Sequence, residues 1–510
     1  MKKITTKFLV CLLLLGINFQ LFAQHVTVTP NGITPASTHP RLSYDAIVAL
    51  PNPQKGDIAY DLTFACLRVY NGSKWVCSYQ SPYEPSPSPN ITAIAQIGGK
   101  GGDYRSSVAV DASGNVYVAG NYADTVAFGN TSKIAPAERD AFVAKYNNNG
   151  VLQWVQTLAS TGPSEAFAVK VDASGNVLVT GTYGGTATFG STTKTAVGND
   201  IFIVKYNTNG VFQWVKTIEH FVFFPSLALD NSGNVYITGG FMNTITIETT
   251  SRTSLGSFDM MLAKFGTDGS LQWLQSAGGT GQDMGTKLAT DAAGNVYVTG
   301  HLYYTETFGG LSVVRKGETD MFVAKYNASG AIQWVQTAGG SYPDNAEGIA
   351  LDAAGNVYVT GFFQNNASFG TINKTTNGGP DVFIVKYDNN GSFLDVQTFG
   401  GGEGDFVKGI AVDNAGSVYV TGAFGGTISF GNISKTGLGE HDIFVVKYNT
   451  NGRFQWIQTA GSPGFEEPMD ISIDNSGNIY VSGFFNETSN FGGVGLVSKG
   501  SSDIFVARLQ

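Results

Sequence analysis

The sequence predicts an all-β fold: a seven-bladed β-propeller of four-stranded blades, closed by its N-terminal strand and preceded by a small β-hairpin module. One observation behind this is a motif at residues 291–300, Asp-Ala-Ala-Gly-Asn-Val-Tyr-Val-Thr-Gly, whose near-copies recur 58 or 61 residues apart. That period can hold four short strands with their turns. A second observation is composition, since 66 glycines, 12% aromatic and 14% charged residues are typical of an ordered, turn-rich chain. The copies begin at Asp111, Asp172, Asp230, Asp291, Asp352, Asp413 and Asp474.

Residues 1–23 have the features of an export signal. Three lysines precede an apolar run at residues 8–16, and we expect cleavage after Ala23. The run is too short to cross a bilayer, so we expect an exported protein without a membrane span, in the periplasm, on the cell surface or outside the cell. Loss of the three lysines changes the formal net charge from −9 to −12. An acidic chain repels phosphate, which argues against nucleic acid as a partner.

Residues 24–81 predict the small β-hairpin module. Two alternating runs flank Asn71-Gly72, a pair typical of two-residue hairpin turns. If this pair forms the turn, Cys66 and Cys77 lie opposite each other at a separation that a disulfide can span. Export favours the bridge, and two free buried thiols are the alternative. The proline-rich residues 82–90 are then expected to form a semi-rigid linker.

Residues 91–510 predict the propeller. In one repeat, strand-like runs at residues 348–352, 357–361, 381–387 and 393–399 are separated by turn residues, and we name them strands a, b, c and d. Residues 91–99 resemble a strand d that stands before the first strand a, whereas residues 503–510 form a strand c with no d after it. A ring in which residues 91–99 complete the last blade accounts for both ends.

These motifs resemble a known repeat. The patterns D-x-x-G-N-V-Y-V-T-G, F-G, D-x-F-V-A-K-Y and Q-W-V-Q-T-x-G-G, spread over residues 91–510, are similar to the SBBP repeat, the seven-bladed β-propeller repeat of secreted bacterial proteins. The resemblance implies the fold and no particular activity. A weaker similarity, limited to D-x-x-G-N-x-Y, extends to NHL-type and lyase-type propellers. The segment around Asn71-Gly72 also resembles a short β-module near the N-terminus of many secreted bacterial proteins.

Features common to the blades are expected to support the fold. An Asp opens each strand c, and a basic residue follows five positions later on the opposite face, so we interpret the Asp as a cap for turn amides. The D-x-x-G-N turns resemble a calcium loop but hold one carboxylate each, which favours an Asx-stabilised turn. Five strands d carry a Trp, replaced by Asp395 and Ala93 in the others, and we expect these to pack between blades. We expect no metal and no cofactor. A regular aromatic set, also expected to pack, is Tyr122, Tyr183, Phe241, Phe363, Phe424 and Phe485.

The binding site is expected where the blades differ. The d-to-a and b-to-c connections share one face and are long and variable. In one of them, Phe221, Phe223 and Phe224 replace a Gly-Gly loop, and they either form an exposed interaction patch or fold inward to plug the channel. In five blades an acidic residue lies eight positions before the Asp that begins the D-x-x-G-N motif. These acids either make the mouth of the channel negative and able to hold a cation, or they are solvated turn residues. These acids are Asp103, Asp283, Asp344, Asp405 and Glu466.

The sequence favours a binding protein over an enzyme. The five histidines are scattered, and no nucleophile-elbow, zinc-protease, phosphate-loop or paired-cysteine motif is present. We therefore expect an exported, monomeric, non-catalytic binding or interaction scaffold with an unknown protein or glycan partner. The alternative is a propeller-type lyase or hydrolase that acts on an extracellular polymer. That alternative needs a His and a carboxylate that converge in the channel mouth with shifted pKa values.

Overall fold

The structure is a computed structural model that describes residues 41–42, 47, 52–55, 58–61, 66–70, 75–79, 88–219, 222–303, 306–430 and 433–510. The expected export signal and most of the expected linker lie outside these residues. The chain divides into two compact units, residues 1–85 and 86–510. Within the described ranges, no helix combines the length and the apolar character needed to span a membrane.

The first unit contains one four-stranded sheet. Strand β1 pairs in parallel with β2, and the remaining neighbours β2, β3 and β4 pair antiparallel. Ile47 and Ala59 are fully buried against the partly buried Tyr70. The expected simple β-hairpin module is therefore wrong, because the hairpin is one half of a larger sheet. The strands are β1 Arg41–Leu42, β2 Ile58–Asp61, β3 Cys66–Tyr70 and β4 Trp75–Tyr79.

The predicted register of the two cysteines is wrong. The ladder places Tyr70 opposite Trp75 and Arg68 opposite Cys77, with an irregularity between residues 67 and 68. The connection is thus four residues long, and not the two-residue turn at Asn71-Gly72 that would place Cys66 opposite Cys77. The disulfide between these cysteines stays a prediction, now without the register that motivated it.

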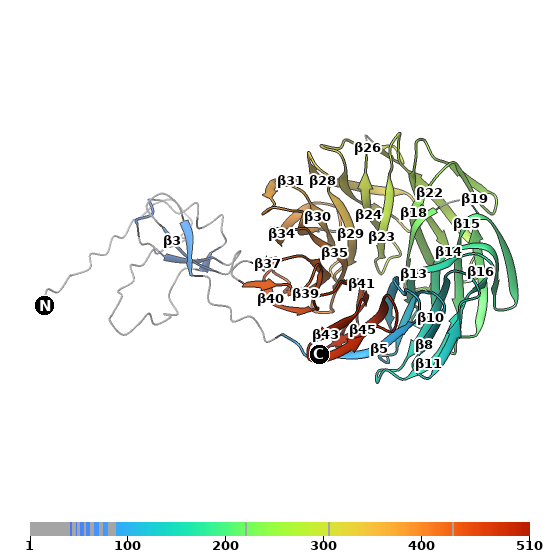
Figure 1. Cartoon of the computed structure of the whole chain (residues 1–510). Coiled ribbons are helices and arrows are strands. Elements are labelled where there is room, and N and C mark those ends of the chain that lie inside the picture. Colours follow the sequence, from blue (N-terminus) through green and yellow to red (C-terminus); the bar gives the residue numbers. More distant parts are fainter. Residues whose placement is uncertain are drawn as a thin grey trace, which may run out of the picture. The chain divides into compact units, whose positions relative to one another are not determined.

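The second unit is an all-β propeller whose blades lie around a common centre (Figure 1). Each blade pairs strands a to b, b to c and c to d in antiparallel fashion. The a strands are β6 Ser106–Val110, β13 Ser164–Val171, β17 Val222–Leu229, β23 Met284–Thr290, β29 Asn345–Leu351, β35 Asp405–Val412 and β41 Glu466–Ile473. The b strands are β7 Val116–Tyr122, β14 Val177–Phe189, β18 Val235–Phe241, β24 Val296–Leu302, β30 Val357–Phe363, β36 Val418–Phe424 and β42 Ile479–Phe485. The c strands are β10 Asp140–Tyr146, β15 Thr192–Tyr206, β21 Asp259–Phe265, β27 Asp320–Tyr326, β33 Asp381–Tyr387, β39 Asp442–Tyr448 and β45 Asp503–Leu509. The d strands are β11 Leu152–Thr157, β16 Phe212–Ile218, β22 Leu271–Ala277, β28 Ile332–Gly340, β34 Phe393–Gly401, β40 Phe454–Ala460 and β5 Ile91–Gly99.

A β-hairpin forms the b-to-c connection, where the sequence predicts a variable loop. The F-G motif supplies its turn, as at Gly370, whose φ of 55° suits a tight two-residue turn between paired Phe369 and Ile372. In one blade the long strands β14 and β15 form this hairpin themselves. The other hairpins are β8 Thr125–Phe128 with β9 Thr131–Ile134, β19 Thr244–Ile247 with β20 Thr250–Thr253, β25 Glu306–Phe308 with β26 Leu311–Val313, β31 Asn366–Phe369 with β32 Ile372–Thr375, β37 Thr427–Phe430 with β38 Ile433–Thr436, and β43 Thr488–Phe491 with β44 Val494–Val497.

These hairpins join neighbouring blades and correct the predicted fold class. Gly339 and Gly340 at the end of β28 pair with Ser368 and Ala367 of β31 in the next blade, and β34 pairs with β37 in the same way. A further short strand, β12 Ala159–Ser160, pairs with β14. In three places among the described strands, a hairpin extends the sheet of the preceding blade to six strands, three other hairpins form separate two-stranded sheets, and the remaining blade sheets contain four or five strands. The predicted seven-bladed propeller of separate four-stranded blades after a hairpin module is wrong as stated, and the fold is an all-β propeller with sheets that cross between blades.

Strand β5 completes the blade that contains the C-terminus. It pairs antiparallel with β45, with Ile97 opposite Ile504 and Ile91 opposite Leu509. Figure 1 shows β5 beside β45 near the C-terminus. The pairing agrees with the closure expected from the incomplete ends of the repeat array. Since β45 has a partner on both sides, this blade exposes no free edge at its third strand.

The repeated D-x-x-G-N motif forms the a-to-b turn. At Asp291, Oδ1 accepts hydrogen bonds from the amides of Ala293 (3.0 Å) and Asn295 (2.9 Å), while Oδ2 accepts from Asn295 Nδ2 (2.7 Å) and from the Tyr297 hydroxyl (3.1 Å). Both carboxylate oxygens are thus occupied by the turn itself. The interpretation as an Asx-stabilised turn is confirmed at this position, and the same bonds recur at Asp111 and Asp352.

The core lies between the blades. One apolar cluster joins Tyr117 and Val143 of one blade to Val177 and Phe202 of the next, and similar clusters occupy the other interfaces. The regular aromatic set at the end of strand b, represented by Tyr122, is buried as expected. Because each interface is filled by side chains from two sheets, the blades hold the loops at their ends in fixed positions.

Candidate functional site

The phenylalanine segment lies at the start of β17, at the face that carries the d-to-a connections. Phe221 lies outside the described residues, as does His220. The Phe223 ring is partly buried and packs edge-on against Phe258, with 4.4 Å between centroids. The Phe224 side chain is 49% exposed, and its φ of 50° is unusual for a residue with a side chain. A bulge between Phe223 and Ser226 accounts for this turn of the backbone and directs Phe224 outward.

An arginine lies between two aromatic rings next to this segment. The Arg105 guanidinium is 4.5 Å from the centroid of Phe167 and 5.5 Å from that of Phe224. Its Nε donates to Glu165 Oε2 at 3.0 Å, and Arg139 donates to Oε1 of the same carboxylate. We call Arg105, Arg139, Glu165, Phe167 and Phe224 the arginine cluster. It draws on three successive blades and combines two cations, one anion and two rings at a partly exposed surface.

A row of aromatic rings continues along the same face. The distances between successive ring centroids are 5.7 Å for Tyr104–Phe484, 5.9 Å for Phe484–Phe465, 5.0 Å for Phe465–His441, 6.2 Å for His441–Phe406 and 5.3 Å for Phe406–Phe362. Tyr104 is 41% exposed and the other five rings are partly buried. We call these six residues the aromatic row. Each ring contacts the next, and three of the five contacts cross a blade boundary, so the row is a continuous strip over several blades.

The sequence did not identify the arginine cluster or the aromatic row, apart from Phe224. The six residues come from four repeat positions: Tyr104 and Phe406 follow the predicted acid, Phe465 precedes it, Phe362 and Phe484 are next to last in strand b, and His441 precedes strand c. A comparison of one repeat position at a time therefore finds no set. The sequence feature that could have identified these residues is that the residue type at each of these repeat positions differs from blade to blade.

The five predicted acids lie beneath the face and not on it. Asp103, Asp283, Asp344, Asp405 and Glu466 have no exposed surface. Asp344 shows their arrangement: Oδ2 accepts from the Gly340 amide at 2.6 Å and Oδ1 from the Gln364 amide at 3.2 Å. Each acid thereby ties a d-to-a loop to neighbouring backbone. The structure does not place them as an exposed negative mouth or as solvated turn residues.

Burial makes these carboxyl groups hard to ionise. Burial raises the pKa of Asp103 and of Asp344 to about 7 and that of Asp405 to about 8. A second carboxylate opposes ionisation further, since Asp320 lies close to Asp344 and Asp381 close to Asp405. The close approach depends on glycine, because a Cβ at Gly339 would be 2.5 Å from Asp320 Oδ1 and 3.0 Å from Asp344 Oδ2. The two carboxyl groups of each pair, Asp320 with Asp344 and Asp381 with Asp405, thus support the loop, and burial favours the protonated form of Asp344 and Asp405.

The strand-c aspartates cap turn amides, as the sequence predicts. Asp320 Oδ2 accepts from the Lys316 amide at 2.7 Å, Asp442 Oδ2 from the Leu438 amide at 2.7 Å, and Asp503 Oδ1 from the Lys499 amide at 3.1 Å. Among the described residues, no three His, Cys, Asp or Glu side chains gather as a metal-ligand group.

His301 is the histidine most relevant to the enzyme alternative. It lies in β24 opposite Met284 and packs against Tyr303, with 6.3 Å between ring centroids. Burial lowers its pKa to about 4, so the ring is neutral at pH 7. In the described part of the chain its Nδ1 has no hydrogen-bond partner. His441 belongs to the aromatic row.

No family model matches the chain. It is 23% identical over 501 residues to the uncharacterized WD repeat-containing protein L264 of Acanthamoeba polyphaga mimivirus, covering 78% of this chain and 36% of that protein. It is 28% identical over 278 residues to the regulatory protein FlaEY of Caulobacter vibrioides, covering 50% and 29%. The chain thus spans about a third of the length of these relatives. A crystal structure of unknown function from Dyadobacter fermentans aligns with a TM-score of 0.39 and 11% identity, covering 68% of this chain and 94% of that one. The chain is a β-propeller repeat protein.

Proposed function

We propose that the chain is an exported, non-catalytic binding scaffold that contacts a protein partner through the arginine cluster and the aromatic row. The observation that carries the proposal is Arg105 held between the rings of Phe167 and Phe224, with Phe224 49% exposed. Arginine and aromatic side chains dominate the energetics of protein interfaces when they are presented by a rigid support. The blades provide that support from below.

The surroundings favour a protein partner over a small metabolite. The aromatic row extends the contact surface across several blades, so the surface is a strip and not an enclosed pocket. The salt bridge of Lys408 with Glu467, both partly exposed, adds charges of both signs. Interfaces of this kind combine apolar rings with a polar rim.

We propose that the chain is exported, as the features of its first residues and its resemblance to a secreted repeat suggest. The leader-like residues 1–23 and the resemblance to the SBBP repeat of secreted bacterial proteins support a location outside the cytoplasm. A location in the periplasm, on the cell surface or outside the cell is compatible with a binding scaffold whose partner is an envelope or secreted protein.

The test compares partner binding by three forms of the purified chain. The partner is first identified by crosslinking in an envelope extract and then titrated against wild type, Phe224→Asn and Arg105→Gln by surface plasmon resonance. Asparagine tolerates the positive φ at position 224, so the change removes the ring without straining the backbone. Each variant should weaken binding by about tenfold or more.

The matched control is Val211→Ser. Val211 is 57% exposed in a c-to-d turn, at the face opposite the proposed site. This variant should bind as wild type does. Unchanged binding by both Phe224→Asn and Arg105→Gln would refute the proposed site. If wild type binds immobilised glycans and both variants do not, the surface binds a glycan and not a protein. If wild type cleaves an extracellular polymer and His301→Gln does not, the enzyme alternative is favoured.

A further inference from the structure

Four of the blade interfaces share one construction around a tryptophan of the outer strand. The indole Nε1 of Trp334 donates to the carbonyl of Asn389, in the c-to-d turn of the next blade, at 3.1 Å. The indole also packs on Gly391 of that turn, where an added Cβ would be 2.7 Å from the ring. The other three bonds of this kind, all 3.1 Å, run from Trp154 to Thr208, from Trp214 to Thr267 and from Trp273 to Ala328.

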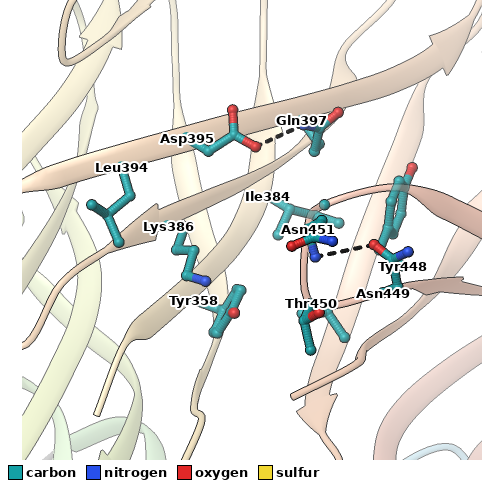
Figure 2. Close-up of a pocket in the computed structure, with 12 residues that line it drawn as sticks. Tyr358, Ile384, Lys386, Leu394, Asp395, Gln397, Tyr448, Asn449, Thr450 and Asn451 are labelled. Carbon is teal, nitrogen blue, oxygen red and sulfur yellow. Dashed lines mark hydrogen bonds between the residues drawn. The ribbon is translucent and has the colours of Figure 1, made fainter. Parts of the chain in front are cut away.

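The interface between β34 and the blade of β39 and β40 lacks this tryptophan. Asp395 pairs with Lys386 in the position where Trp334 pairs with Lys325. A cavity of about 210 Å³ remains, lined by the rings of Tyr358 and Tyr448 and by Ile384 and Val418, among others (Figure 2). An apolar protein cavity of about 150 Å³ is enough to bind benzene, so this space can hold a two-ring aromatic group.

The cavity keeps the recognition groups of the tryptophan interfaces. Thr450 is the second residue of its c-to-d turn, the position that Asn389, Thr208, Thr267 and Ala328 occupy in the turns that accept a tryptophan N–H. Among the described residues, no indole and no lysine donates a hydrogen bond to the Thr450 carbonyl. Elsewhere the lysine of strand c also donates to that carbonyl, as Lys325 does to Asn389 at 3.0 Å. The Lys386 ammonium lies 4.8 Å from the centroid of Tyr358, a contact that Lys325 also makes with Tyr297 at 5.0 Å. Figure 2 shows Lys386 beside Tyr358.

Asp395 adds a group that the tryptophan interfaces do not have. Its Oδ2 accepts from Gln397 Nε2 at 2.8 Å (Figure 2), which fixes the carboxylate at the wall of the cavity. A carboxylate held in this way can bind a cationic amine through a charge-assisted hydrogen bond. The cavity therefore offers an indole-sized space between two tyrosines, a carbonyl acceptor at the place of the indole N–H bond, and an anionic group.

We propose that this inter-blade cavity is a binding site for a cationic indole, a planar two-ring ligand with a ring N–H and an amine. The ring occupies the place of the missing tryptophan side chain between Tyr358 and Tyr448, the ring N–H donates to the Thr450 carbonyl, and the amine binds Asp395. The site lies at the c-to-d turns, away from the arginine cluster, and does not depend on the function proposed for that cluster.

Tryptamine is the probe, titrated into the full chain by isothermal calorimetry and by saturation-transfer NMR. Wild type should bind one equivalent. Asp395→Asn should weaken binding by about tenfold or more, and 1-methyltryptamine, which lacks the ring N–H, should bind wild type more weakly than tryptamine. Asp395→Trp restores the side chain found at the other interfaces and should abolish binding.

A gain-of-site variant provides the matched control. Trp334→Asp should create an equivalent cavity at the preceding interface and raise the number of bound tryptamine molecules to two. If Trp334→Asp does not fold, the proposal is tested by comparing tryptamine binding by wild type with tryptamine binding by Asp395→Trp. Absence of binding to wild type at millimolar tryptamine, or equal binding by wild type and folded Asp395→Trp, would overturn the proposal.

Discussion

Filling the inter-blade cavity should stabilise the propeller. In the variant Asp395→Trp the new indole would pack between Tyr358 and Tyr448 and donate to the Thr450 carbonyl, as Trp334 donates to Asn389. The hydrogen bond contributes about 1 kcal/mol and each ring contact about 0.5 to 1.5 kcal/mol. Against this, the variant loses the bond between Asp395 and Gln397, about 1 kcal/mol. We expect a net gain of about 1 to 3 kcal/mol in the free energy of unfolding.

The assay is guanidinium denaturation of wild type and variant at pH 7, followed by far-UV circular dichroism. The midpoint should rise while the slope stays unchanged, since the surface exposed on unfolding differs little. Trp334→Phe serves as the converse, because it keeps a ring and removes the N–H donor, and it should lower stability by about 1 kcal/mol. A folded Asp395→Trp that is no more stable than wild type would refute the view that Asp395 occupies a vacant tryptophan position.

Three further predictions concern closure, pH and the cysteines. A chain that begins at Lys100 lacks β5 and should unfold with lower cooperativity in denaturant than one that begins at Ser86; equal transitions would contradict the closing role of β5. The folded-state pKa of Asp405 is raised to about 8, above its ordinary 3.8, so its favourable contribution is complete below pH 4 and is lost as the pH rises to 8. Asp405→Asn should therefore match wild type at about pH 4 and exceed its stability at pH 9 by at least about 1 kcal/mol, measured by urea denaturation, and the reverse order would show that the carboxylate is favourably ionised. Thiol counting under denaturing conditions tests the bridge between Cys66 and Cys77, and two reactive thiols in the exported protein would exclude it.

The parts of the fold that repeat could be predicted from the sequence. The D-x-x-G-N motif fixes a turn through contacts within seven residues, from Asp291 to Tyr297, so its structure follows from local chemistry. The closure by residues 91–99 followed from counting strands at both ends. The b-to-c hairpins were missed because their strands are only three or four residues long, and their pairing depends on the next blade.

The candidate site was harder to predict because its residues meet across blades. Arg105 contacts Phe167 and Phe224, which lie in two other repeats, and no local pattern encodes that meeting. The acids before strand a were expected at the surface, since they follow glycines in a long connection. Asp405 is instead fully buried, and its Oδ2 accepts a hydrogen bond from the Gly401 amide at 2.7 Å.

The pairing of β5 with the hairpin of the first blade has a consequence for the order of assembly during synthesis. Ile97 and Gly99 of β5 pair with Phe128 and Val126 of β8, about thirty residues further on, whereas β45 follows some four hundred residues later. The N-terminal strand can therefore be held by the earliest-made blade while the rest of the chain emerges. When β45 is made, it meets a partner that is already in place, and ring closure becomes the docking of β45 onto a formed edge.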